Sequence, residues 1–376
     1  MRKNLFVRSI AAVSGIVMLA SLAACGDNTS SAGNNSGSTS TEKITGSFSG
    51  AGATSQQAAE EAWISAYMAA NSGANVTYNP IGSGAGVTTF LSGAAAWAGS
   101  DKALSDDEVT QSSDKACANG TTAFDVPVYI SPIAIIFNLK GVSDAGKHIN
   151  LDADTAAKIF DGKIVKWNDP AIANQNKDLT LPDTQITVVH RSDKSGTTQN
   201  FVSYFKDQAP DSWTHELSEN WPDIPGQQSA KGTSGVVTAV KQADGTIGYA
   251  DFSQVGDLGT AAIKVGENYN EISADAGSKV IEDSEIDTSV KGDNRVVVKI
   301  NHATEAKGAY PIVLVSYDIA CPAYKDASTA KFVKSWLTYV TSDEGQKTAS
   351  SAAGSAPLPS NIVKKVTKSI EAIKTK

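Results

Sequence analysis

Residues 185–206 read QITVVHRSDKSGTTQNFVSYFK, and this stretch carries the pattern that decides the fold class. The first six residues, QITVVH, are rich in β-branched side chains and predict a strand. Phe201, Tyr204 and Phe205 recur at helical spacing and predict a helix over 197–206. A polar turn containing glycine separates the two. A strand followed by a short turn and a helix is the repeating unit of an α/β protein.

The rest of the chain alternates in the same way. Apolar and small residues at 59, 62, 63, 66, 67 and 70 share one face of a helix expected over 56–70. The run IAIIF at 133–137 is typical of a buried central strand. We therefore expect an α/β protein with largely parallel sheets. Further helices are expected at 86–92, 328–340 and 362–373, further strands at 74–78, 246–250 and 311–316, and irregular loops at 208–235 and 252–300.

Length and composition narrow the class of protein. The chain has 376 residues, 41% of them hydrophobic, which suits two or three folded domains and excludes a wholly disordered chain. Its formal charge of −8 argues against a nucleic-acid binder. After the N-terminal segment, no run of 18 apolar residues occurs, which excludes a membrane-spanning bundle. Three cysteines and four scattered histidines match no metal motif, so we expect neither a metal nor a cofactor.

The N-terminus has the features of an export signal. Basic residues at 2, 3 and 8 precede an apolar stretch at 10–20, and LAAC follows at 22–25. A cysteine at the cleavage point resembles the lipobox of bacterial lipoproteins. We therefore expect residues 1–24 to be removed, Cys25 to carry the lipid, and residues 26–45, rich in Ser, Gly, Asn and Thr, to form a flexible tether. The alternative is an ordinary signal peptide with an incidental cysteine. The predicted location is the outer face of the cell membrane.

The other two cysteines are Cys117 and Cys321. An extracytoplasmic compartment is oxidising, which favours a disulfide bond between them. Two unpaired thiols remain the alternative.

Three segments place glycine and hydroxyl residues between a strand and a helix. They are GAGATS at 50–55, GSGAG at 82–86 and RSDKSGT at 191–197. The N-terminus of a helix presents unpaired N–H groups and partial positive charge, so it suits an anion. Each segment alone is also typical of an ordinary tight turn with an N-cap. The near match to a P-loop at 141–147 lacks the Ser or Thr that should follow its lysine, and we treat it as a coincidence.

The spaced set of motifs resembles one family. GAGAT at 50–54, IGSGAG at 81–86, GSDKALSD at 99–106, VVHRSDKSGTT at 188–198, KGTSG at 231–235 and TIGYAD at 246–251 occur in this order. Together they resemble the phosphate-binding protein of bacterial high-affinity ABC phosphate importers, over residues 46–375. The resemblance implies a two-lobed fold of the type II periplasmic-binding-protein kind with a ligand cleft between the lobes. Lobe 1 would comprise 46–130 plus 309–376, lobe 2 would comprise 131–308, and the hinge would lie near 128–131 and 307–311. Both Cys117 and Cys321 would then fall in lobe 1.

The resemblance also implies the ligand-binding residues. Matched by motif position, the phosphate ligands would be Thr54, Ser55, Ser83, Asp101, Arg191, Ser195, Gly196 and Thr197. Asp193 would pair with Arg191 and hold its guanidinium in place. Two positions depart from the family pattern: Ser55 stands where Phe is usual, and His190 stands where Arg is common.

The chemistry of these residue types favours phosphate. Seven of the eight implied ligands can donate hydrogen bonds, and Asp101 accepts one. A carboxylate repels a fully deprotonated anion such as sulfate but can accept the proton that phosphate carries at neutral pH. We therefore expect a monomeric phosphate receptor that delivers phosphate to the membrane subunits of an ABC importer. No nucleophile elbow or catalytic carboxylate pair is recognised, so we expect no enzymatic activity. The alternatives are a binding protein for another oxyanion, a sensory or adhesive lipoprotein, and a secreted phosphate-ester hydrolase.

Overall fold

A computed structural model describes residues 43–143 and 146–375 of the chain. The predicted signal peptide, Cys25 and residues 26–42 of the predicted tether lie outside the described residues. Residues from Lys43 onward form one compact unit. Within the described ranges, no helix is both long enough and apolar enough to cross a membrane.

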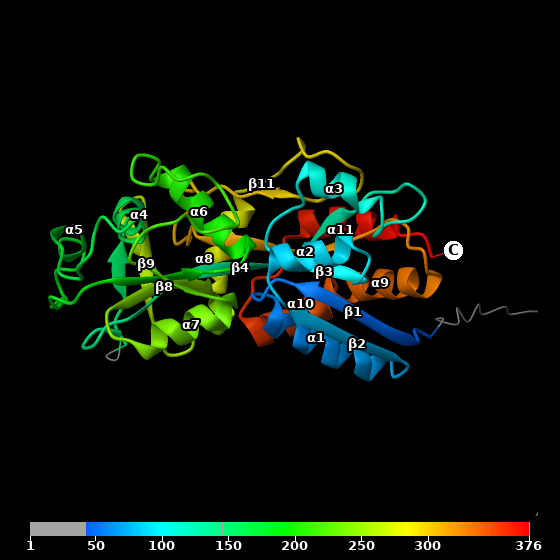
Figure 1. Cartoon of the computed structure of the whole chain (residues 1–376), viewed down its shortest axis with the longest axis horizontal. Coiled ribbons are helices and arrows are strands. Elements are labelled where there is room, and N and C mark those ends of the chain that lie inside the picture. Colours follow the sequence, from blue (N-terminus) through cyan, green and yellow to red (C-terminus); the bar gives the residue numbers. More distant parts are fainter. Residues whose placement is uncertain (1–42, 144–145, 376) are drawn as a thin grey trace, which may run out of the picture. The chain divides into compact units, whose positions relative to one another are not determined.

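Strands and helices alternate through this unit, as the sequence predicts (Figure 1). The strands are β1 (Gly46–Gly52), β2 (Ala74–Pro80), β3 (Trp97–Ser100), β4 (Phe124–Asn138), β5 (Ile149–Leu151), β6 (Thr187–Arg191), β7 (Gln228–Ala230), β8 (Thr246–Asp251), β9 (Gly259–Val265), β10 (Asn268–Asn270), β11 (Glu285–Ile286), β12 (Val298–Lys299) and β13 (Val313–Ala320). The helices are α1 (Gln57–Ala70), α2 (Ser83–Leu91), α3 (Asp106–Ser112), α4 (Ala153–Phe160), α5 (Pro170–Ala173), α6 (Gly196–Gln208), α7 (Gly232–Gln242), α8 (Ala274–Glu282), α9 (Ala327–Val340), α10 (Asp343–Ala353) and α11 (Ser360–Glu371), with a 3₁₀ turn at Phe252–Gln254.

The long strand β4 connects two groups of strands. The strand order is β2-β1-β3-β13-β4-β8-β6-β7, and β9 also pairs with β4. Residues 124–132 of β4 pair with β13, whereas residues 133–138 pair with β8. In Figure 1, β1 to β3 with α1, α2 and α9 lie toward one end of β4, and β8 and β9 with α4 and α7 lie toward the other. The buried run IAIIF at 133–137 is therefore the second half of a longer strand.

The prediction of largely parallel sheets is wrong for the centre of the sheet. β1 pairs in parallel with β2 and β3, and β6 pairs in parallel with β7 and β8. However, β13 is antiparallel to β3 and β4, and β4 is antiparallel to β8 and β9. Helical crossovers produce the parallel pairs on each side, whereas β4 and β13 run alongside each other in opposite directions.

Most predicted elements are present with shifted ends. The predicted helix at 86–92 begins earlier, at Ser83, because Gly82 adopts a φ of 98° and turns the chain directly from β2 into α2. The expected loop at 252–300 contains α8 and the strands β9 to β12, and the expected loop at 208–235 contains β7 and the start of α7. Glycine-rich and polar composition concealed these short elements, whose apolar faces are narrow.

Aromatic packing and one disulfide bond stabilise the β1–β3 side of the sheet. The ring of Trp97 lies 5.3 Å from that of Trp336 and 5.7 Å from that of Phe332, which joins β3 to α9. Tyr67 of α1 adds an edge contact with Trp336 at 5.3 Å. The Cys117–Cys321 disulfide that the sequence analysis favoured is present, and it links residues 204 positions apart in the chain.

Glycine allows α2 to lie directly on β1. A Cβ added at Gly86 would lie 2.3 Å from the Cα of Gly52, a distance that no packed side chain can have. The first turn of α2 is therefore held against the end of β1. This contact brings the 50–55 and 82–86 segments together.

Candidate functional site

The segments singled out in the sequence meet at one place in the fold. Thr54 and Ser55 follow β1, Ser83 opens α2, and Asp101 follows β3. Arg191 ends β6, and Ser195 is the N-cap of α6, so Gly196 and Thr197 form the first turn of that helix. All eight expected ligand residues are buried. These segments lie at the carboxyl ends of β1, β2, β3 and β6, where α/β proteins bind their ligands.

Asp101 is the centre of the hydrogen-bond network. Its Oδ2 accepts from the hydroxyls of Ser55 at 2.6 Å and Thr197 at 2.8 Å, and its Oδ1 accepts from Ser316 at 2.8 Å. Its backbone N–H donates to Ser83 Oγ at 3.3 Å. Burial raises the pKa of the Asp101 carboxyl, while the three hydroxyl donors and Arg191 lower it in part. Asp101 therefore joins the first, second and third glycine-rich segments.

Glycine at position 196 lets α6 approach Asp101 closely. A Cβ added at Gly196 would lie 2.7 Å from the carbonyl carbon of Asp101. The Asp101 carbonyl oxygen accepts from Asn200 Nδ2 at 2.6 Å, one turn further along the helix. The N-terminus of α6 therefore lies directly against the loop after β3, and its partial positive charge favours an anion there.

Arg191 supplies a buried cation at the site. Its Nε donates to Asp193 Oδ1 at 2.8 Å, and its Nη2 donates to Asp193 Oδ2 at 2.6 Å. This is the pairing expected for Asp193, and it fixes the plane of the guanidinium. Burial raises the pKa of Asp193, but its bonds with Arg191 and the Gly232 N–H outweigh burial and bring the pKa below its ordinary value. Two of the five guanidinium N–H groups donate to Asp193, and the other three can donate to an anion.

The two departures from the family pattern have structural explanations. The Ser55 side chain is fully buried and donates its hydroxyl to Asp101, so this residue contributes a polar contact of its own. The His190 ring stacks on Trp221 with centroids 5.5 Å apart and an interplanar angle of 14°. Burial lowers the pKa of His190, which favours the neutral ring. Arg191 therefore provides the buried positive charge of this segment, whereas Lys194 is exposed.

Sequence reasoning missed four residues that complete the network. Ser316 bonds to Asp101, Asn200 bonds to the Asp101 carbonyl, and Thr233 and Gln254 bond to Thr54. Thr233 lies in KGTSG at 231–235, a motif that the resemblance included without assigning it a role. Ser316 lies in an ordinary apolar strand, and no sequence signal marks it.

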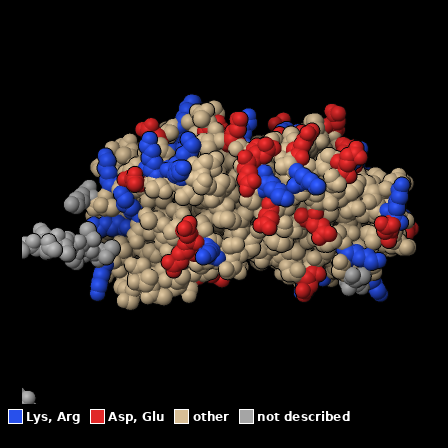
Figure 2. Space-filling view, turned by 180° about the vertical axis from the view of Figure 1, so that it is seen from behind, with Lys and Arg blue, Asp and Glu red and all other residues tan. Residues whose placement is uncertain are grey.

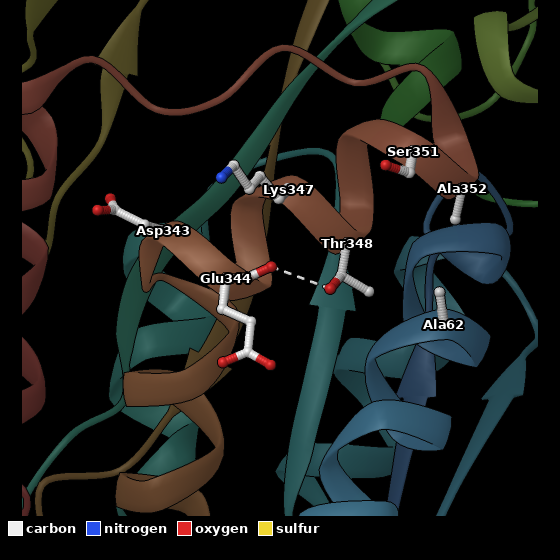
Figure 3. A pocket seen from close by; sticks show the side chains of 7 residues that line it. All are labelled: Ala62, Asp343, Glu344, Lys347, Thr348, Ser351 and Ala352. Atoms are coloured by element: carbon white, nitrogen blue, oxygen red, sulfur yellow. Dashed lines mark hydrogen bonds between the residues drawn. The ribbon is translucent and has the colours of Figure 1, made fainter.

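Charge is mixed on one face of the molecule, and a separate groove has none of the proposed ligand residues in its lining. Acidic and basic side chains are intermixed on the face shown in Figure 2. Figure 3 shows the groove between α1 and α10, where Ala62 faces Ala352 and where Thr348 donates to the Glu344 carbonyl at 2.9 Å. Small side chains and a mixture of charges line it, unlike the donors that converge around Asp101. Among the described residues, no three His, Cys, Asp or Glu side chains are grouped to hold a metal ion.

Comparison with known proteins assigns the chain to a class and then to a family. The model of the PBP superfamily domain matches residues 37–344. The chain is 36% identical to phosphate-binding protein PstS 2 of Mycobacterium tuberculosis, over 98% of this chain and 99% of that protein. It is 33% identical to phosphate-binding protein PstS of Xylella fastidiosa, over 85% of this chain and 83% of that protein. The chain therefore belongs to the PstS phosphate-binding protein family, as the spaced motifs suggested.

Solved structures agree with this fold. A phosphate-binding protein from Stenotrophomonas maltophilia superposes with a TM-score of 0.67 at 20% identity, covering 86% of this chain and 93% of that one. A high-affinity periplasmic phosphate-binding protein solved with phosphate bound gives a TM-score of 0.69 at 22% identity, with the same two coverages. The two-lobed α/β binding-protein fold is therefore confirmed.

Proposed function

We propose that this protein binds inorganic phosphate at the Asp101 network. One observation carries the proposal: a buried carboxylate, a buried guanidinium and the first turn of α6 converge with hydroxyl donors from three segments of the chain. The donors suit the oxygens of an anion, and the carboxylate suits an anion that still carries a proton. The relatives are named as phosphate-binding proteins, which supports the same ligand.

The proposed ligands are the eight residues that the family resemblance implies, with the roles of Ser55 and Thr197 refined. The Ser55 hydroxyl is engaged with Asp101, so Ser55 would reach the ligand through its backbone N–H. The Thr197 hydroxyl likewise donates to Asp101, so Thr197 would also reach the ligand through its backbone N–H, in the first turn of α6. Arg191 would donate two N–H groups to phosphate oxygens while Asp193 holds it from the other side.

We also propose that two lobes close around the ligand. Lobe 1 would comprise 46–130 plus 309–376 and lobe 2 would comprise 131–308. The exchange of partners along β4, from β13 to β8 at residue 133, supports a hinge close to 128–131. Hydrogen bonds such as Thr197 to Asp101 would then join the closed lobes.

The proposed physiological role is delivery of phosphate to the membrane subunits of an ABC importer by a monomeric receptor, with no catalytic step. Cys25, by its lipobox context, would carry the lipid that holds the receptor at the outer face of the membrane. The assignment of the chain to a family of binding proteins supports this role.

Calorimetric titration of the purified protein tests the ligand directly. The protein is first unfolded and refolded to remove any bound anion, then titrated with phosphate and with sulfate at neutral pH. We expect saturable binding of phosphate with one site and much weaker binding of sulfate. Equal binding of both anions would contradict the role given to Asp101, and binding of neither would refute the proposed function.

A further inference from the structure

The first turn of α7 holds the side chain of Thr54. The backbone N–H of Thr233 donates to Thr54 Oγ1 at 3.0 Å, and the two threonine hydroxyl oxygens lie 2.9 Å apart. The two residues are 179 positions apart in the chain, and both side chains are buried. Since Thr54 precedes Ser55, whose hydroxyl donates to Asp101, α7 reaches the anion site through this contact.

The direction of these hydrogen bonds has a chemical consequence. A hydroxyl has one proton to donate and two lone pairs that accept. The Thr233 N–H occupies one lone pair of Thr54, and the Thr233 hydroxyl can occupy the other. With both lone pairs engaged, Thr54 can only donate. An anion presents acceptors, so a threonine restricted to donation is suited to it.

We propose that Thr233 is a positioning residue that makes Thr54 an obligatory donor to the bound anion. The inference rests on the proposed phosphate binding and gives a role to the KGTSG segment at 231–235. Thr233 acts through Thr54 and need not touch the ligand.

The surrounding contacts fix this arrangement. Gly232 adopts a φ of +72°, and a Cβ there would lie 3.3 Å from Thr54 Cγ2, so the first residue of α7 packs directly on Thr54. The Gly232 N–H donates to Asp193 Oδ1 at 3.0 Å, and Gln254 Nε2 donates to the Thr54 carbonyl at 2.8 Å. Asp193 also holds Arg191, so the start of α7 orients two donors of the same site.

Phosphate titrations of three variants of the full chain test the proposal. Thr233→Val removes the hydroxyl and keeps both the shape and the backbone N–H. Losing one buried hydrogen bond costs about 0.5–1.5 kcal/mol, so we expect phosphate affinity to fall roughly twofold to thirteenfold. Thr233→Ser restores the hydroxyl and is expected to bind within about twofold of the parent protein. Thr238→Val makes the same change at an exposed position of α7 and is expected to leave binding unchanged.

A double-mutant cycle separates positioning from general damage. In a Thr54→Val background there is no hydroxyl to orient, so adding Thr233→Val should weaken phosphate binding no further. An equal loss in both backgrounds would overturn the proposal, as would parental affinity in Thr233→Val. Either result leaves the proposed function standing, provided that the parent protein binds phosphate. A parent protein that binds no phosphate would refute the proposed function itself and this inference with it.

Discussion

Replacing Asp101 with asparagine tests how the site would distinguish phosphate from sulfate. A carboxylate has about four lone-pair positions, and hydroxyls of Ser55, Thr197 and Ser316 occupy three of them. An amide can keep its oxygen between Ser55 and Thr197 and turn its NH₂ toward Ser316. Ser316 can accept there, because a hydroxyl both donates and accepts. The network therefore survives, but the remaining acceptor of Asp101 becomes a donor.

The expected magnitudes follow from that exchange. A buried acceptor oxygen that receives no hydrogen bond weakens binding by about 1–3 kcal/mol. The Asp101 carboxylate imposes this loss when sulfate binds to the parent protein, but the amide of Asp101→Asn does not. Sulfate affinity should therefore rise by roughly fivefold to 150-fold. Phosphate affinity should fall by no more than about tenfold, since hydrogen bonds to a neutral acceptor are about 1 kcal/mol weaker than those to a charged one.

Sulfate titrations across the acid range provide the decisive assay, because sulfate keeps its charge there. Burial raises the pKa of Asp101, so its neutral form, which can donate, appears at a higher pH than usual. Sulfate binding to the parent should therefore strengthen as the pH falls, while binding to Asp101→Asn should stay flat. Asp107→Asn removes a charge from an exposed position of α3, the helix that follows the Asp101 segment, and serves as the control. If the parent protein and Asp101→Asn exclude sulfate equally at every pH, the charge of Asp101 is not what excludes sulfate.

Three further predictions address the cation, the core and the anchor. Arg191→Lys keeps the charge but loses the two-pronged donor, so phosphate affinity should fall about 30-fold or more, whereas Lys194→Ala, at an exposed position, should have little effect in the same titration. Burial raises the pKa of Asp318 to about 8, so the folded state binds a proton that the unfolded state has released, and the melting temperature should decline as the pH rises from about 4 to about 8. Asp318→Asn should flatten that decline, and an unchanged slope would contradict the assignment. Cys25→Ser should release the protein into the medium or leave an uncleaved precursor, and a processed, membrane-bound variant in cell fractionation would refute the lipid anchor.

Local sequence patterns determined much of this fold. Helical spacing at 56–70 and 197–206 places α1 and α6 within one or two residues of their ends, because an amphipathic face must be buried whatever it packs against. The hydroxyl-rich turn before α6 could also be read directly, because Ser195 caps that helix and N-cap chemistry is local.

The tertiary structure alone decided the rest. Whether the central strands pair in parallel depends on the direction in which β13 lies beside β4. β13 begins more than 170 residues after β4 begins. Ser316 reaches Asp101 across 215 residues, and Thr233 reaches Thr54 across 179. No local pattern can encode such contacts, because they arise only when separate elements pack. The sequence thus predicted which residues would bind an anion, and the packing of β13 and α7 decided which neighbours contact them.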